Sequence, residues 1–364
     1  MPDTANDIPA NFVYRPLQPA DIPEAVQIAV ENFEEFRQHP EYIAQWFERR
    51  ITHNPWQDSL ACIGAGVWMN QRLVGFRAMF VQPWWLNGES MLIAFGSNTC
   101  VDQRFRGQGL ATQLIERSRI LAPINGSVTA GVITQKAFRK CGFVEIGGDS
   151  NDFFRLRVGY RGSWEKRAGK TLGRWLGSLS DLSLRLRNWK LRSGGFQLQE
   201  VLRCEAEFDD LWARAKPAYL SCLERSSRYL NWRLFDFPTC ALRLFALRDT
   251  SGQLRAYAIW HRQDFSDSIS MAVLRDVFYS LGDETALQAL LYHLFDYWRN
   301  DGISWGNLEV ASPSLTALFR KLGYEPLASH GNRYQIYSEQ PLLDTVLQNW
   351  YRSGIDGDYF DHPL

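Results

Sequence analysis

Residues 98–112 read NTCVDQRFRGQGLAT, and this stretch is the most informative part of the sequence. It passes from a strand-like run through a turn with two arginines and two glycines into a helical pattern. Such a turn presents consecutive backbone N–H groups and a helix N-terminus, which together form a site for phosphate oxygens. Gly107 and Gly109 remove side chains where an anion must approach the backbone, and Arg104 and Arg106 add positive charge. The stretch therefore predicts a phosphate-binding loop.

Two common phosphate loops do not fit these residues. A Walker loop ends in Gly-Lys-Ser or Gly-Lys-Thr, and no such triplet occurs here. A Rossmann fingerprint needs a third glycine at position 112, which is Thr112, and an acidic residue about 20 positions further on to hold a ribose. No Asp or Glu occurs between Glu116 and Glu145. A nucleoside triphosphate or dinucleotide site is therefore not expected.

A third kind of loop does fit. The pattern Arg104-x-x-Gly107-x-Gly109 resembles the acyl-CoA pyrophosphate loop of the GNAT (GCN5-related) N-acetyltransferase superfamily. The predicted elements around it also resemble that family. They are a first strand at 12–16, helices at 22–33 and 40–50, β-rich runs at 60–70, 73–85 and 90–101, a helix at 108–121, a strand at 127–133, and a short helix that closes on Gly142-Phe143. The resemblance covers residues 12–158 well and 198–338 in outline.

The resemblance implies an α/β (α+β) fold with two GNAT-like domains, each a mixed, mostly antiparallel central sheet flanked by helices. It implies acetyl-CoA or another acyl-CoA as co-substrate, with the main chain of Cys100 and Val101 along the pantetheine arm. The N–H groups of about 104–109 would hold the pyrophosphate. The implied CoA-binding residues are Cys100, Val101, Arg104, Arg106, Gly107, Gln108, Gly109, Leu110, Ala111 and Thr112.

The catalytic residues are less clear. The family commonly places a proton-donating Tyr four residues before the Gly-Phe pair, but this chain has Phe138 there. Three alternatives stay open: another donor such as Cys141, a water or a Tyr of the second domain; a thiolate that leaves unassisted; or acyl-CoA binding without catalysis. No Glu marks a general base on the central strand, and the residues that could orient a water there are Ser97, Asn98 and Thr99.

The second half of the sequence repeats the first. The run 138–143, FRKCGF, returns as FRKLGY at 319–324, an offset of 181 residues. We therefore expect a duplicated domain, at 10–158 and 198–338. Where the second copy should carry the loop, residues 276–284 read DVFYSLGDE, with one glycine and three acids. This charge is wrong for a pyrophosphate, so the second copy is expected not to bind CoA.

A basic connector, 159–197, joins the two copies. Residues 161–192 hold nine basic and two acidic side chains, a net charge of +7. Apolar residues recur there at helical spacing: Leu172, Trp175, Leu176, Leu179, Leu182 and Leu186. We expect an interdomain helix docked by this Leu/Trp face. The alternative is peripheral contact of 161–192 with an anionic membrane surface or an acidic partner. The remaining residues, 339–364, are expected to form a solvated acidic tail.

Composition limits the class of protein. The 364 residues include 40 basic and 40 acidic side chains, 45% are apolar and 22% charged, as in soluble globular proteins. The zero net charge argues against a general nucleic-acid binder. Six cysteines without C-x-x-C spacing predict neither a metal site nor disulfides. No signal peptide or membrane span is visible, so the chain is expected in the cytoplasm.

These observations favour a cytoplasmic N-acyltransferase of tandem GNAT type. It would transfer an acyl group directly from acyl-CoA to a primary amine, with a small molecule preferred over a protein as acceptor. Two other classes of function compete with it. One is a non-catalytic acyl-CoA-binding or sensing protein, suggested by Phe138. The other is a tRNA-dependent aminoacyl transferase of tandem GNAT-like fold, suggested by the duplication and the basic connector; it has no need of a CoA loop.

Overall fold

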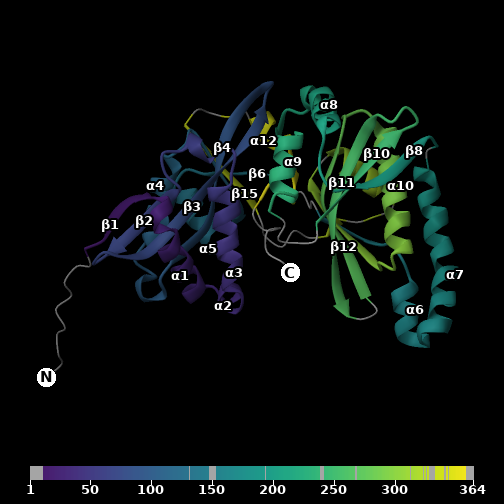
Figure 1. Cartoon of the computed structure of the whole chain (residues 1–364), viewed down its shortest axis with the longest axis horizontal. Helices are drawn as coiled ribbons and strands as arrows, with labels where there is room; N and C mark the ends of the chain where they lie inside the picture. The colour runs from purple at the N-terminus through teal and green to yellow at the C-terminus, as the bar shows by residue number, and fades with distance from the viewer. Residues whose placement is uncertain are drawn as a thin grey trace. The chain divides into compact units, whose positions relative to one another are not determined.

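The computed structural model divides the chain into two compact units that interleave in sequence (Figure 1). Unit 1 comprises residues 1–83, 92–146 and 331–342, and unit 2 comprises 84–91, 147–330 and 343–364. The structure describes residues 11–130, 132–146, 153–192, 194–237, 242–266, 269–311, 313–322, 324, 326–327, 333–339, 342 and 344–357.

Unit 1 is a mixed sheet with helices on both faces. Its strands are β1 (Val13–Leu17), β2 (Gly64–Met69), β3 (Arg72–Leu86), β4 (Glu89–Val101), β5 (Ile124–Ala130), β6 (Val144–Ile146) and β15 (Arg333–Ser338). Its helices are α1 (Ile22–Asn32), α2 (Glu34–Gln38), α3 (Pro40–Phe47), α4 (Leu110–Arg119) and α5 (Val132–Lys140), with a π-helix at Glu48–Thr52 after α3. The strand order is β1-β2-β3-β4-β5-β15-β6. The elements predicted from the sequence between 12 and 146 are confirmed, with shifts of a few residues at their ends.

Large side chains pack on both faces of β3 and β4. On one face, the Phe80 ring stacks on Phe95 at 5.9 Å, and Trp46 of α3 meets Phe80 edge-on. On the other face, α4 and α5 bring Ile115 and Phe138 together in a buried cluster. A tight turn at Asn87-Gly88, with positive φ at both residues, joins the two strands, as is typical of an Asn-Gly pair between two strands. The loop after β4 therefore follows a strand that is packed on both faces.

Unit 2 contains a second sheet of similar design. Its strands are β7 (Phe153–Arg157), β8 (Phe196–Val201), β9 (Ser221–Leu223), β10 (Arg243–Asp249), β11 (Leu254–Ser266), β12 (Ile269–Tyr279), β13 (Trp305–Ala311), β14 (Pro326–Leu327) and β16 (Trp350–Ser353). Its helices are α6 (Arg161–Ala168), α7 (Lys170–Asn188), α8 (Ala206–Ala215), α9 (Ser227–Leu234), α10 (Glu284–Asn300), α11 (Pro313–Lys321) and α12 (Asp344–Gln348). The strands β8-β10-β11-β12 are antiparallel, β12 and β13 are parallel, and β7 pairs with β13.

The two halves of the sequence exchange a strand. In unit 1, β15 lies between β5 and β6 and pairs with both. In unit 2, β7 pairs antiparallel with β13. Both sheets also share an element order, since β5 and α5 recur as β13 and α11 at the offset of 181 residues. The contiguous boundaries 10–158, 159–197, 198–338 and 339–364 stay a prediction, and the duplication stays a proposal.

The connector forms α6 and α7, but the expected docking face is wrong. The buried residues of α7 are Gly173, Gly177, Asp181, Leu184 and Asn188. A Cβ atom at Gly173 or Gly177 would come within 2.6 Å of the α6 backbone, so the two helices pack backbone to backbone. This close contact requires small residues. On the opposite side the predicted Leu/Trp face is exposed, except for Leu176, which is half-buried.

The prediction of a solvated tail is also wrong for residues 344–357. Strand β16 pairs with both β9 and β13, and Trp350 and Tyr351 are buried. Asp356 is fully buried and accepts a hydrogen bond from Arg225, whose guanidinium also pairs with Asp276. The acidic residues of this segment therefore include one that balances a buried cation. Residues 358–364 lie outside the described residues. Among the helices that are described, none combines the length and apolar character that crossing a membrane requires.

Candidate functional site

A short turn joins β4 to α4 and contains the residues predicted to bind phosphate. The chain makes a 3-10 helix (Gln103–Phe105) and then continues to Gly109, which caps the N-terminus of α4. Gly107 and Gly109 have φ of +82° and +78°, a conformation that L side chains rarely adopt. A Cβ atom at either position would meet no described atom within 4 Å. Both glycines therefore border open space and not packed protein.

Six consecutive backbone N–H groups at this turn have no acceptor. From Gly107 to Thr112, no N–H group finds a hydrogen-bond partner within the described part of the chain. Helical bonding starts at Gln113, whose N–H donates to the Gly109 carbonyl at 3.2 Å. The first turn of a helix also carries the positive end of the helix dipole. We call the N–H groups of residues 107–112 the cradle, because this arrangement suits an anion. That it holds a pyrophosphate stays a prediction.

The cradle begins three residues later than predicted. The Arg104 N–H donates to Asp102 Oδ1 at 3.0 Å, and the Phe105 N–H donates to the Asp102 carbonyl at 2.9 Å. The Arg106 N–H donates to the Gln103 carbonyl at 3.4 Å. Of the predicted range 104–109, the N–H groups of residues 104–106 are therefore engaged within the loop itself, two of them with Asp102 and one with Gln103, and those of 107–109 are not.

Arg104 and Arg106 are held by hydrogen bonds to residues that precede the cradle in the sequence. Arg104 Nε donates to Asp102 Oδ1 at 3.0 Å, and these hydrogen bonds lower the pKa of the buried Asp102 carboxyl. Arg106 Nε donates to the Val101 carbonyl at 3.2 Å, and its Nη2 donates to Asn32 Oδ1 at 3.3 Å. Both arginines remain largely exposed, so they place positive charge beside the cradle, although Asp102 offsets part of it.

Strands β4 and β5 separate next to the cradle. They pair in parallel only at Ala94–Asn125 and Phe95–Gly126 among the described residues, although β4 continues to Val101 and β5 to Ala130. Asn98 lies in this unpaired part with φ of +48°, a left-handed conformation in the middle of a strand. Its Nδ2 atom is buried and has no hydrogen-bond partner among the described residues. The opening therefore leaves main-chain groups of both strands for an extended ligand.

The other predicted residues of β4 line the end of this strand. Cys100 is buried, its thiol contacts the Ile28 carbonyl of α1, and burial raises its pKa to about 12. Ser97 is buried as well, and the Thr99 hydroxyl accepts a hydrogen bond from Arg77. The Cys100 side chain therefore faces the α1 side, which fits a role for its backbone alone.

Phe138 and Cys141 lie together in the core under α4. They form a buried cluster with Ile115 and Phe143, and the Phe138 ring meets Phe143 at 4.8 Å. The Cys141 thiol contacts the Thr112 carbonyl at 3.6 Å, and burial raises its pKa. Cys141 thus stays protonated at neutral pH, but its sulfur is already engaged in the core.

Arg77 is a functional candidate that the sequence analysis missed. Its guanidinium is 2% exposed, and its Nη1 donates to Thr99 Oγ1 at 2.6 Å. The cation lies against Gly96, where a Cβ atom would approach Nη2 to 2.0 Å, and its Cζ is 4.9 Å from the Phe138 ring centroid. A buried cation therefore stands at the point where β4 and β5 separate. The signal was visible, since Arg77 is a charged residue within the apolar run 73–81.

The corresponding turn of unit 2 is built differently. Asp283 caps α10, with its Oδ1 accepting from the Ala286 N–H at 3.1 Å, and it pairs with Arg255. Asp276 is buried against Arg225. A carboxylate therefore occupies the helix N-terminus where unit 1 has N–H groups without an acceptor among the described residues. That this copy binds no CoA stays a prediction.

Comparison with solved structures identifies the fold that carries this site. No protein-family model matches the sequence, and a search of curated proteins found no match. A crystal structure of a GCN5-related N-acetyltransferase from Anabaena variabilis has a TM-score of 0.62 and 15% identity, with 89% of this chain and 72% of that chain covered. The fold is that of the GCN5-related N-acetyltransferases.

Two further solved structures share this GNAT fold. A probable N-acyltransferase from Enterococcus faecalis has a TM-score of 0.59 and 10% identity, covering 90% of this chain and 72% of that chain. Saccharomyces cerevisiae N-myristoyltransferase with bound myristoyl-CoA has a TM-score of 0.51 and 11% identity, covering 94% of this chain and 82% of that chain. The similarity extends over both halves of the chain.

Proposed function

We propose that the chain is an acyl-CoA-dependent N-acyltransferase that moves an acetyl or other acyl group to a primary amine of a small molecule. The observation that carries the proposal is the row of six free N–H groups from Gly107 to Thr112 beside the opening between β4 and β5. Acyl-CoA presents a pyrophosphate followed by an extended pantetheine arm that ends in the thioester. One molecule would therefore fill both features. The GNAT fold of acyl-transferring neighbours supports this proposal.

The proposed reaction is direct transfer in a ternary complex. The neutral amine attacks the thioester carbon, the C–N bond forms, the C–S bond breaks, and CoA leaves as a thiolate. The amine proton passes to water, for which Ser97 and Asn98 are the proposed orienting residues, and the thiolate takes up a proton. A thiol pKa of about 8.5 makes this thiolate a tolerable leaving group at neutral pH. Orientation of the two reactants can then supply much of the rate.

Arg77 provides a substitute for the missing tyrosine in this proposal. Phe138 has no proton to donate, but the Arg77 guanidinium lies over its ring at 4.9 Å. A fixed cation in a water-poor site stabilises negative charge that develops during a reaction far more than it would in water. We therefore place the departing thiolate near Arg77, where the charge of the guanidinium, and not a proton, would stabilise it.

Phe138 also favours a second candidate, a non-catalytic acyl-CoA-binding protein. The Phe138 ring is fully buried between α4 and α5, so it contributes packing and no proton. This candidate uses the same cradle. It differs from the first only in turnover.

Release of free thiol from acetyl-CoA and from longer acyl-CoA thioesters, measured across a panel of small amines, tests the proposed function. Amine-dependent thiol release supports the transferase. Tight CoA binding with no thiol release from any pair, also after Phe138→Tyr, supports the binding protein instead. No binding of CoA together with salt-dependent tRNA binding would overturn both and favour the aminoacyl transferase.

A further inference from the structure

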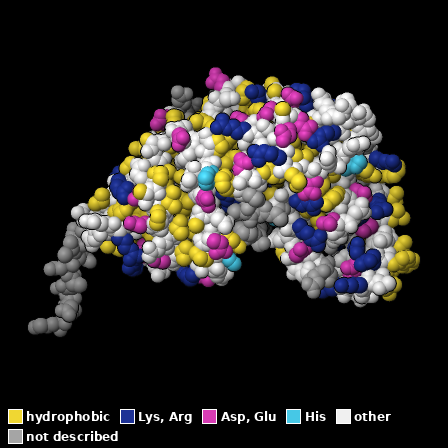
Figure 2. Space-filling view, viewed as in Figure 1, with side chains coloured by type: hydrophobic (Ala, Val, Ile, Leu, Met, Phe, Trp, Pro, Cys, Tyr) yellow, Lys and Arg dark blue, Asp and Glu magenta, His cyan; other side chains and the backbone are white. Residues whose placement is uncertain are grey.

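Helix α7 presents an exposed apolar stripe along its whole length. The stripe consists of Leu172, Trp175, Leu179, Leu182, Leu186 and, just after the helix, Trp189. Each of these side chains is between 54% and 64% exposed. So much exposure is unusual for six large apolar residues that share one helix face. Figure 2 shows hydrophobic side chains along the edge of unit 2 where Figure 1 places α7. The stripe contributes little to the core of unit 2 and needs another explanation.

The stripe faces directly away from the side by which α7 is held. Gly173 and Gly177 pack on the α6 backbone, and Asp181 accepts a hydrogen bond from the Tyr160 N–H at 2.7 Å. At 100° per residue these buried positions lie opposite Leu179 and its neighbours in the stripe. The helix is therefore fixed in place by one face and offers the other face to a partner.

The exposed charged side chains of residues 161–192, the segment that carries the stripe, are all basic. Seven cations of residues 161–192 are exposed: Lys166, Arg167, Lys170, Arg174, Arg185, Lys190 and Arg192. The two acids of residues 161–192 are both engaged, since Glu165 pairs with Arg161 at 2.8 Å and Asp181 is buried. A partner of this surface must therefore combine an apolar layer with negative charge.

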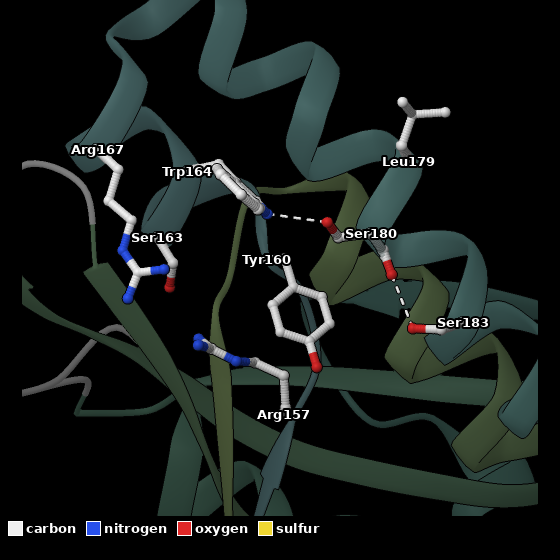
Figure 3. A pocket seen from close by; sticks show the side chains of 8 residues that line it. All are labelled: Arg157, Tyr160, Ser163, Trp164, Arg167, Leu179, Ser180 and Ser183. Carbon is white, nitrogen blue, oxygen red and sulfur yellow. Dashed lines mark hydrogen bonds between the residues drawn. The ribbon is translucent and has the colours of Figure 1, made fainter.

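A pocket of about 420 Å³ adjoins the stripe (Figure 3). Arg157 and Arg167 line it together with hydroxyl groups that include those of Tyr160 and Ser163, and Leu179 of the stripe lines it as well. Arg157 is held by the faces of Trp305 and Tyr160, with its Cζ 4.0 Å and 4.9 Å from the ring centroids. Its Nη1 atom is buried and has no hydrogen-bond partner among the described residues. Burial lowers the pKa of Arg157, and the charge of Arg167 acts in the same direction, so a bound anion would relieve both effects.

We propose that α6 and α7 bind the surface of an anionic phospholipid membrane. The Leu/Trp stripe would enter the boundary between headgroups and acyl chains, and the pocket would accept a lipid phosphate between Arg157 and Arg167. Amphipathic helices with leucine and tryptophan on one face and basic residues beside it bind membranes in this way. A second copy of the chain fits less well, because it would bring two surfaces of the same positive charge together. The proposal does not depend on the proposed catalytic function.

Vesicle flotation with the full-length protein tests this proposal. The two kinds of vesicle are pure phosphatidylcholine and phosphatidylcholine mixed with phosphatidylserine. We expect at least about tenfold tighter binding to the mixed vesicles, weakened by added salt because surface charges are screened. The double variant Trp175→Ser/Leu182→Ser should weaken binding more than about tenfold, since two apolar side chains no longer insert. Arg167→Glu should weaken it about tenfold. The control Leu202→Ser removes an 81% exposed leucine outside the stripe and should change nothing.

The outcomes separate the membrane from other partners. All substituted side chains are exposed, so the variants should keep the circular dichroism spectrum and Tm of the parent protein. Equal binding to both vesicles, no binding to either, or binding that the double variant leaves intact overturns the proposal. A dimer seen by analytical ultracentrifugation and abolished by the double variant also overturns it in favour of a second copy. Displacement of the protein from vesicles by inorganic phosphate at constant ionic strength would overturn it in favour of a soluble anion.

Discussion

Gly107 and Gly109 act through their backbone alone. Both have positive φ and border open space, so alanine at either position costs the strain of a left-handed backbone, about 1–2 kcal/mol. We expect the double variant Gly107→Ala/Gly109→Ala to remain folded but to lose most CoA binding, because the two Cβ atoms stand where the pyrophosphate should lie. Calorimetric titration with CoA measures this loss.

The β3–β4 hairpin offers a matched control. Gly88 has φ of +91° and equally open surroundings, but it lies at the opposite end of β4 from the loop. Gly88→Ala should therefore lower the free energy of unfolding by about as much as each substitution at Gly107 or Gly109, while the affinity for CoA stays unchanged. A similar loss of affinity in both variants would mean that strain, and not the cradle, explains the effect.

Arg77 is expected to act on the rate and not on acyl-CoA binding. Arg77→Met should lower kcat by about 10²–10³-fold with a small change in the KM for acyl-CoA, as for the loss of one oxyanion donor. Because Arg77 is buried, some stability will be lost too, so thermal unfolding must be measured in parallel. Adding Phe138→Tyr to this variant should restore part of kcat, since a hydroxyl then stands beside the same position. A variant with reduced Tm and unchanged kcat would assign Arg77 a structural role only.

Sequence and structure agree on the loop but differ on individual groups. The glycine spacing was sufficient to predict the phosphate loop, because backbone conformation there depends on local residues. It did not show that Asp102 would cap the 3-10 helix and accept from the amides of Arg104 and Phe105, or that the Gln103 carbonyl would accept from the Arg106 amide. The sequence also did not predict the contact between Arg77 and Phe138. The two residues are 61 positions apart and meet only because α5 packs on the sheet.

Among the secondary-structure elements, the positions of the strands in the sequence were easier to predict than the opening between β4 and β5. Alternating apolar runs and the Asn87-Gly88 turn indicate β2, β3 and β4 directly. The opening between β4 and β5 depends on pairing that ends at Phe95 and Gly126, and no local pattern encodes that. Helix α7 shows the same limit, since its periodicity predicts an apolar face but not whether the protein buries it.

The segment that ends in β16 is anchored by a buried charge network. Arg225 Nε donates to Asp276 at 2.9 Å and its Nη2 donates to Asp356 at 2.6 Å, with all three side chains unexposed. Arg225→Met leaves two buried carboxylates facing each other and should lower the free energy of unfolding by about 3–5 kcal/mol. The exposed Arg262, which pairs with Asp264 and Asp301, is the control, and Arg262→Met should cost less than about 1 kcal/mol. Urea titration of both variants measures the difference, and equal costs would contradict the buried network.

The same network predicts a pH dependence. Burial raises the pKa of Asp356 from 3.8 to about 6 in the folded protein even beside Arg225. When the pKa of a carboxyl is higher in the folded than in the unfolded protein, its protonation stabilises the fold. This stabilisation is fully present at a pH below the pKa of the unfolded state, and it is lost as the pH rises through the pKa of the folded state. In Arg225→Met the pKa should rise further. The cost of the substitution should therefore be largest at high pH and shrink as the pH falls towards about 6, below which the carboxyl is protonated in both folded proteins. A cost that does not change with pH would contradict this.

At the scale of the whole molecule, each sheet depends on a strand from the other half of the sequence. Strand β15 pairs with both β5 and β6, so a fragment of residues 10–158 lacks the strand between them. We expect this fragment alone to show no cooperative unfolding, and co-expression with residues 159–364 to restore it. Urea denaturation followed by tryptophan fluorescence checks this. A fragment 10–158 that unfolds cooperatively and binds CoA would contradict it.

The most direct measurement is a pair of calorimetric titrations of the full-length protein, one with CoA and one with pantetheine. Pantetheine carries the arm that fits between β4 and β5 but lacks the pyrophosphate. If the N–H groups of Gly107 to Thr112 hold that pyrophosphate, CoA binds and pantetheine binds far more weakly. Equal affinity for both ligands, or no heat with CoA, would contradict the proposed site and the transferase built on it.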